Sequence, residues 1–129
     1  MKALVVDDHR DVAEFIAEAL KEMEGMDVDI ATSAASARAY SSSRQYGLFV
    51  IDVYLKGGDT APDGLDYAKS LLAEDSKTPI ILMTGKSYSK IITSVIVKTG
   101  TTVLLSKPID LTTLIDTVHK VMPDPDEEE

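Results

Sequence analysis

The sequence predicts an α/β fold in which five parallel strands form one sheet with helices on both faces. Five apolar runs rich in branched residues recur along the chain, and polar, glycine or acidic residues follow each run. Four of the runs are continuously apolar, which is typical of strands that are buried on both faces of a parallel sheet. Segments with helical periodicity lie between the runs. The chain has 129 residues, of which 44% are hydrophobic, and these values fit one compact domain.

The five strands are expected at residues 3–6, 28–31, 48–51, 79–83 and 102–105. The segment after the first strand has the clearest helical pattern. Its apolar residues recur at positions i, i+3, i+4, i+7, i+8 and i+11, Gly25 follows as a stop signal, and Asp8 or Asp11 could cap its start. This stripe consists of Val12, Phe15, Ile16, Ala19, Leu20 and Met23.

Helices are also expected after each of the other four strands. Residues 33–45 are rich in alanine and serine, and residues 87–98 are apolar nearly all round. The helix after the third strand is marked by Leu65, Ala68, Leu71 and Leu72. The last helix begins after Pro108 with Asp110 as its N-cap and ends before Pro123. Its apolar face consists of Leu111, Leu114, Ile115, Val118 and Met122.

Alternation of strands and helices gives a (βα)₅ arrangement. Right-handed crossovers would place its helices on both faces of the sheet. The expected strand order is 2-1-3-4-5, the doubly wound, flavodoxin-like order. Residues 1–122 would form this domain. Residues 123–129 would form a disordered acidic tail, because they combine prolines and acids without apolar residues. In such sheets, ligands bind beyond the carboxyl ends of the strands, where the strand order reverses.

Composition excludes several classes of protein. The absence of cysteine excludes disulfides and thiolate metal sites, and no apolar run approaches the roughly 18 residues of a membrane span. The N-terminal apolar stretch is too short for a signal peptide, so a cytoplasmic protein is expected. The net charge is -9, and 17 acids against 13 bases remain when the tail is set aside, which disfavours nucleic-acid binding.

Polar side chains stand at the ends of four predicted strands: Asp7 and Asp8, Asp52, Thr84, and Lys107. Three carboxylates this close repel one another, so either one keeps a proton or a cation neutralises them. A cluster of oxygen ligands favours a hard cation such as Mg²⁺. His9 and His119 are interpreted as surface or capping residues, since neither has a partner at metal-ligand spacing on an evident shared face.

These residue types suit phosphoryl transfer to a carboxylate. Asp52 can attack phosphorus and become an aspartyl phosphate if a metal and Lys107 offset the charge of the transferring group. The hydroxyl of Thr84 can donate a hydrogen bond to the new phosphate if the chain moves it inwards.

The chain resembles the response-regulator receiver family over about residues 2–122. The resemblance is carried by Leu4-Val5-Val6-Asp7-Asp8, Ile51-Asp52, Met83-Thr84-Gly85 and Ser106-Lys107-Pro108, in order and at near-family spacing. It implies that Asp52 is the phospho-acceptor. It also implies that Asp8, Asp52 and the backbone carbonyl of Tyr54 coordinate Mg²⁺, with Asp7 acting mainly through a water.

The resemblance further implies partners and a mode of action. The phosphoryl donor would be a phosphohistidine on a sensor histidine kinase or a phosphotransfer protein. The chain would catalyse its own phosphorylation and dephosphorylation, and would otherwise not be an enzyme. The helix expected at residues 87–98, the strand at residues 102–105 and the last helix would contact a downstream protein or a second copy. Part of this interface could be an apolar stripe, which consists of Ile91, Ile92, Val95, Ile96 and Val97.

Some positions depart from the family pattern. The segment from Tyr54 to Gly64 is about four residues longer than usual, and its Lys56 and Asp59 could touch a phosphate or a partner. Leu104 stands where the family commonly has an aromatic residue that moves with the threonine. Lys86 could meet the phosphate or the kinase. No output module fits in the residues after the last helix, so the chain is either a stand-alone regulator or a domain excised from a longer protein.

Three other functions compete with this interpretation. Gly85-Lys86-Ser87 is the end of a P-loop, which would indicate a nucleotide hydrolase, but Ile80 stands where that motif needs a glycine. A phosphatase of the haloacid-dehalogenase type would need a second aspartate at the position of Tyr54. A binding module that keeps the fold without phosphorylation is the third alternative.

Overall fold

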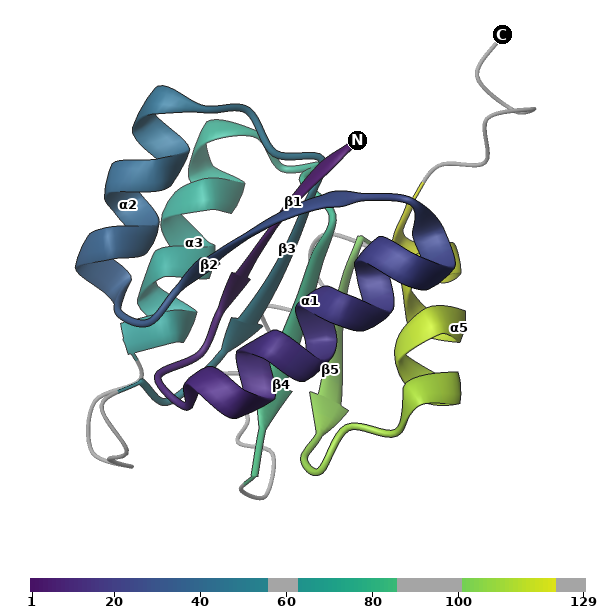
Figure 1. Cartoon of the computed structure of the whole chain (residues 1–129). Helices are drawn as coiled ribbons and strands as arrows, with labels where there is room; N and C mark the ends of the chain where they lie inside the picture. Colours follow the sequence, from purple (N-terminus) through teal and green to yellow (C-terminus); the bar gives the residue numbers. More distant parts are fainter. Residues whose placement is uncertain (56–62, 86–100, 123–129) are drawn as a thin grey trace, which may run out of the picture.

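The computed structural model describes residues 1–55, 63–85 and 101–122. Five parallel strands form one sheet in the order β2-β1-β3-β4-β5 (Figure 1), which confirms the predicted fold class and strand order. The strands are β1 (Lys2–Val6), β2 (Asp27–Ala31), β3 (Leu48–Asp52), β4 (Ile80–Thr84) and β5 (Thr102–Ser106). The described helices are α1 (Arg10–Glu24), α2 (Ala34–Ser43), α3 (Asp63–Glu74) and α5 (Leu111–Val121). The helix predicted at 87–98, its apolar stripe, most of the 54–64 loop and the 123–129 tail lie outside the described residues.

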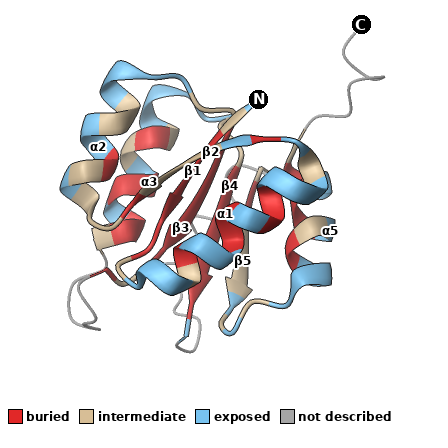
Figure 2. Ribbon diagram, viewed as in Figure 1, coloured by how far each residue is buried: buried red, intermediate tan, exposed pale blue. Residues whose placement is uncertain are grey.

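The helices cover both faces of the sheet, with α1 and α5 on one side and α2 and α3 on the other (Figure 1). Successive strand residues point to opposite faces. In β1, Leu4 and Val6 pack in the core beneath α2 and α3, while Ala3 and Val5 pack beneath α1 and α5. Every residue of β3 and β4 is buried, so the central strands form the red interior of Figure 2. The continuous apolar runs therefore reflect burial on both faces, as predicted.

Helix α1 lies on the sheet through a face that only partly coincides with the predicted stripe, since Val12, Ile16, Ala19 and Leu20 pack in the core. Its buried residues are Ala13, Ile16, Ala17, Ala19 and Leu20. Two bulky members of the predicted stripe stand outside this face, since Phe15 is 48% exposed and Met23 is 53% exposed. Alanines allow the helix to approach the strands closely, and the bulkier side chains flank the contact.

The ends of α1 and α5 test the predicted caps. The N-cap of α1 is His9, which makes no side-chain capping bond, so the expectation that Asp8 or Asp11 caps this helix is wrong. At the other end, the helix stops at Gly25, as predicted. Gly25 adopts the left-handed conformation with φ of 65°, and its N–H donates to the carbonyls of Leu20 and Lys21. The predicted cap of α5 is confirmed, because Asp110 Oδ2 accepts a hydrogen bond from the Thr113 N–H at 3.0 Å.

A polar cluster fixes the connection between α2 and β3 against the edge strand β2. Asp29 Oδ2 accepts hydrogen bonds from Tyr46 Oη at 2.7 Å and from Arg44 Nη1 at 2.9 Å. Burial, followed by the hydrogen bond to Asp29, raises the pKa of Tyr46 to about 12. The phenol therefore keeps its proton and remains a donor across the physiological range.

None of the helices in the described ranges is long and apolar enough to span a bilayer.

Candidate functional site

Parallel pairing brings the predicted strand-end residues to one edge of the sheet. Val6 is in register with Ile51, so Asp7 and Asp52 emerge side by side from β1 and β3. Thr84 is the last residue of β4 and is fully buried. Its carbonyl accepts a hydrogen bond from the Lys107 N–H at 2.9 Å, which places Lys107 next to β4. The edge predicted from the sequence thus carries the predicted residues.

Lys107 bridges the two most deeply buried acids. Its Nζ lies 2.8 Å from Asp7 Oδ2 and 3.0 Å from Asp52 Oδ2. Asp7 is fully buried and Asp52 is only 5% exposed, so little water competes for these contacts. The single ammonium group therefore provides the shared counter-charge for two carboxylates in a setting of low dielectric.

The same contacts set the protonation of Asp52 and Lys107. Burial raises the pKa of Asp52, although the charge of Lys107 and its hydrogen bond oppose this effect. Burial alone would lower the pKa of Lys107, but the hydrogen bond to Asp7 and the charge of Asp52 raise it overall. At neutral pH the lysine is a fixed cation, and the Asp52 carboxylate is less stable than it would be in water.

The main chain around Asp52 is held closely. Asp52 Oδ1 accepts a hydrogen bond from the Tyr54 N–H at 3.2 Å. The first turn of α3 packs on the same segment, where the Gly64 N–H donates to the Val53 carbonyl at 3.0 Å. A Cβ on Gly64 would overlap the carbonyl oxygen of Asp52 and lie 2.8 Å from its carbonyl carbon. Glycine is required here because α3 approaches the backbone of β3 so closely.

Asp8 contributes an acceptor that lacks a hydrogen-bond partner. Its Oδ1 is buried and accepts no hydrogen bond from the described residues. Such an atom loses hydration free energy that a hydrogen bond or a cation would otherwise replace. Asp7, Asp8, His9 and Asp52 each offer a ligand atom, and these atoms lie within 4.8 Å of one another. The orphaned oxygen and the close donors fit a divalent cation.

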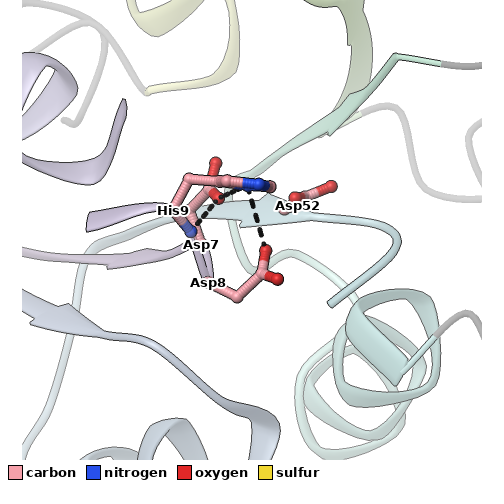
Figure 3. Close-up of side chains that lie close together, drawn as sticks. All are labelled: Asp7, Asp8, His9 and Asp52. Atoms are coloured by element: carbon pink, nitrogen blue, oxygen red, sulfur yellow. Dashed lines mark hydrogen bonds and ion pairs between the residues drawn. The ribbon is translucent and has the colours of Figure 1, made fainter. Parts of the chain in front are cut away.

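His9 also lies at this edge, although its position in the sequence did not predict a place in the site. The interpretation as a surface or capping residue holds, because the side chain is 59% exposed and His9 occupies the N-cap position, although without a side-chain capping bond. Its Nδ1 lies 3.3 Å from Asp8 Oδ1 and 3.4 Å from Asp7 Oδ1 (Figure 3). The signal in the sequence that could have indicated its place in the site is its position directly after two acids, at the start of a helix.

Other residues singled out in the sequence lie near this edge or outside the described ranges. Tyr54 follows β3 and is partly buried. Leu104 lies within β5 and packs partly buried against the core beneath α2 and α3. Ile80, where a P-loop would need glycine, is the buried first residue of β4. Lys56, Asp59 and Lys86 lie outside the described residues.

A groove of about 610 Å³ opens beside Lys107, between the start of α1 and the segment that leads from β5 to α5. The exposed ring of Phe15 forms part of its wall. This residue of the predicted α1 stripe therefore lines the groove and does not pack in the core. The lining residues are His9, Asp11, Val12, Phe15, Lys107, Pro108 and Ile109.

The chain is similar in sequence and in fold to known response regulators. The chain is 34% identical over 108 residues to the photosynthetic apparatus regulatory protein RegA of Rhodovulum sulfidophilum, covering 83% of this chain and 55% of RegA, so it spans about half the length of that relative. The receiver domain of NtrX from Brucella abortus superposes with a TM-score of 0.78 at 25% identity, covering 93% of this chain and 97% of that domain. The Francisella response regulator 1452 receiver domain superposes with a TM-score of 0.75 at 27% identity, covering 93% and 94%. The sequence model of the response regulator receiver domain matches residues 3–119, and the chain belongs to this family.

Proposed function

We propose that this receiver domain, residues 1–122, accepts a phosphoryl group on Asp52 in a reaction that depends on Mg²⁺. The observation that carries the proposal is the position of the Asp52 carboxylate. It lies at the end of β3, hydrogen-bonded to Lys107 Nζ at 3.0 Å and beside Asp7 and Asp8. Burial raises its pKa and leaves it poorly solvated, which favours reaction of the carboxylate with an electrophile.

Asp8, Asp52 and the backbone carbonyl of Tyr54 would hold Mg²⁺ directly, and Asp7 would act through a water. The buried Asp8 Oδ1, which accepts no hydrogen bond from the described residues, supports this assignment, since carboxylate oxygens are the ligands that Mg²⁺ prefers. When bound, Mg²⁺ offsets the negative charge of the carboxylates and of the incoming phosphoryl group.

In the transfer, a carboxylate oxygen of Asp52 bonds to phosphorus as the bond from phosphorus to the donor imidazole nitrogen breaks. The electron pair of that bond remains on the imidazole. Lys107 stays protonated, because its pKa is raised, and its charge stabilises the transferring group. The hydroxyl of Thr84, at the end of the adjacent strand, would donate a hydrogen bond to the phosphoryl oxygens after an inward movement. Attack of water on phosphorus would later return the free carboxylate.

The donor is a phosphohistidine on a sensor histidine kinase or a histidine phosphotransfer protein. The chain acts as a signalling receiver that catalyses its own phosphorylation and dephosphorylation, in the cytoplasm and without contacting nucleic acid or membrane by itself. Its output goes to a downstream protein or a second copy through the helix expected at residues 87–98, β5 and α5. The alternatives from the sequence analysis are a nucleotide hydrolase, an aspartate-nucleophile phosphatase and a non-phosphorylated binding module.

The test is the mass of the intact protein after incubation with a small acyl phosphate and Mg²⁺. Wild-type protein should gain one phosphoryl group that alkali removes, and Asp52→Asn should gain none. Asp116→Asn is the matched control, because Asp116 is an exposed acid on α5 and should not affect labelling. Equal labelling of the Asp52→Asn variant would refute the acceptor assignment. Hydrolysis of ATP in place of labelling would favour the nucleotide hydrolase.

A further inference from the structure

The imidazole of His9 lies where a metal ligand would lie. This inference rests on the metal site of the proposed function and concerns which cations that site prefers. Nδ1 of His9 is 3.4 Å from Asp7 Oδ1 and 3.3 Å from Asp8 Oδ1, so the ring contacts two carboxylates at once (Figure 3). One of these oxygens, Asp8 Oδ1, is the buried acceptor to which no described residue donates a hydrogen bond.

The spacing of these atoms matches that of ligands around one ion. Two ligands with bonds of about 2.1 Å lie about 3.0 to 3.4 Å apart when their bond angle is between about 90° and 108°. The 3.3 Å separation between His9 Nδ1 and Oδ1 of the proposed direct ligand Asp8 falls in this range. Across the four residues the ligand atoms spread to at most 4.8 Å, slightly more than the about 4.2 Å between ligands on opposite sides of one ion. A small side-chain rotation would close the difference.

The His9 ring makes few contacts besides those with the two acids. Its side chain is 59% exposed and therefore adds little to the core. It makes no capping bond to α1, whose first turn it precedes. Among residues 1–55, 63–85 and 101–122, the ring makes no polar contact other than those with Asp7 and Asp8. The position of the ring is thus explained by the acids alone.

We propose that the neutral His9 Nδ1 is a direct metal ligand, which makes this site selective for first-row transition dications such as Co²⁺ and Ni²⁺. Mg²⁺ is a hard ion that prefers oxygen and gains little from imidazole, whereas Co²⁺ and Ni²⁺ bind imidazole nitrogen well. The aspartates alone would bind Mg²⁺ nearly as well as the aspartates together with His9. The nitrogen adds affinity mainly for the softer ions.

The experiment compares untagged wild-type protein with His9→Asn and His119→Asn, since the chain has only these two histidines. Asparagine places an oxygen near the position of Nδ1 and is favourable at an N-cap, so His9→Asn should fold. Calorimetric titration at a pH above the ordinary imidazole range should show Co²⁺ and Ni²⁺ affinities about tenfold or more lower in His9→Asn, with Mg²⁺ affinity within about threefold of wild type. The His119→Asn variant should match wild type.

A spectroscopic measurement reports the ligand independently of affinity. Proton NMR of the Co²⁺-loaded protein should show one exchangeable, paramagnetically shifted imidazole N–H resonance in wild type and His119→Asn, and none in His9→Asn. Persistence of this resonance in His9→Asn would overturn the proposal.

The outcomes separate this inference from the function beneath it. If Mg²⁺ binds and Asp8→Asn prevents its binding, but His9→Asn changes the affinities for Mg²⁺ and Co²⁺ equally, only the role of His9 is wrong. If wild-type protein binds neither cation, both the metal site of the proposed function and the role of His9 as a metal ligand are refuted.

Discussion

The close contact between α3 and β3 makes Gly64→Ala a sharp test of how the site is built. Gly64 lies in the first turn of α3, and the added methyl group would overlap the Asp52 carbonyl oxygen and stand 3.1 Å from Ile51 Cγ2. The obstacle is backbone of a fully buried strand, so it cannot rotate away. Helix α3 must move outwards instead, which weakens the hydrogen bond from the Gly64 N–H to the Val53 carbonyl.

The expected cost follows from these contacts. Overpacking of a buried site costs about 1–3 kcal/mol, and a clash with backbone lies towards the upper end of this range. Loss of the hydrogen bond adds about 1 kcal/mol. Alanine offsets about 1 kcal/mol, because it favours helix and restricts the unfolded chain more than glycine does. The net loss of unfolding free energy is about 2–3 kcal/mol, or about 10 °C in Tm for a domain of this size.

Urea denaturation followed by circular dichroism measures this loss. The matched control is Gly85→Ala, because a Cβ on the exposed Gly85 meets no atom within 4 Å and its φ is not positive. That variant should stay within about 0.5 kcal/mol of wild type. Phosphoryl labelling of Gly64→Ala should also slow, because the clash displaces the main chain of the acceptor. An unfolding free energy equal to that of wild type, with an unchanged m-value, would refute the close packing of α3 on β3.

Three further predictions concern ionisable groups. Replacing Lys107 with methionine should lower the unfolding free energy at neutral pH by about 2–3 kcal/mol, because two buried carboxylates lose their counter-ion, and urea titrations should show a smaller loss in acid. The folded-state pKa of Asp52 is raised, so in chelator the Tm of wild type should increase as pH falls from neutrality through that pKa. Asp52→Asn should lack this increase and melt higher than wild type at neutral pH; an identical pH profile would contradict it. Tyr46→Phe should cost about 1 kcal/mol by loss of the hydrogen bond to Asp29, and ultraviolet titration should place the wild-type phenol near the pKa of about 12.

The strands and their order were predictable because burial on both faces leaves a strong signal in sequence. The run from Leu48 to Ile51 has no polar residue, and β3 occupies Leu48–Asp52, one residue longer. Helix faces were less predictable. Periodicity groups Phe15 and Met23 with Ile16, but packing against a sheet favours the small Ala13 and Ala17 at the contact. Hydrophobicity alone does not report how closely a helix can approach.

The site was predictable to the extent that it depends on strand ends. Asp7, Asp52, Thr84 and Lys107 are placed by parallel pairing, so a correct sheet brings them together. His9 depends instead on how the chain turns from β1 into α1. Asp7 Oδ1 accepts a hydrogen bond from the His9 N–H at 2.9 Å, which folds the turn back on itself and carries the ring to the acids. Side-chain bonds of this local kind have no periodic signature.

The charges at this edge connect its stability with its chemistry. Three carboxylates and one ammonium group leave two negative charges in excess, and Lys107 already bonds one oxygen of Asp7 and one of Asp52. The excess falls near Asp8, whose buried Oδ1 has no hydrogen bond from the described residues. A divalent cation bound here would supply the missing charge. Part of its binding free energy would then offset the destabilisation that the excess negative charge causes in the folded protein. In the proposed function, phosphorylation of Asp52 would bring further negative charge to the same edge, so Lys107 and the cation would have more charge to offset after transfer than before it.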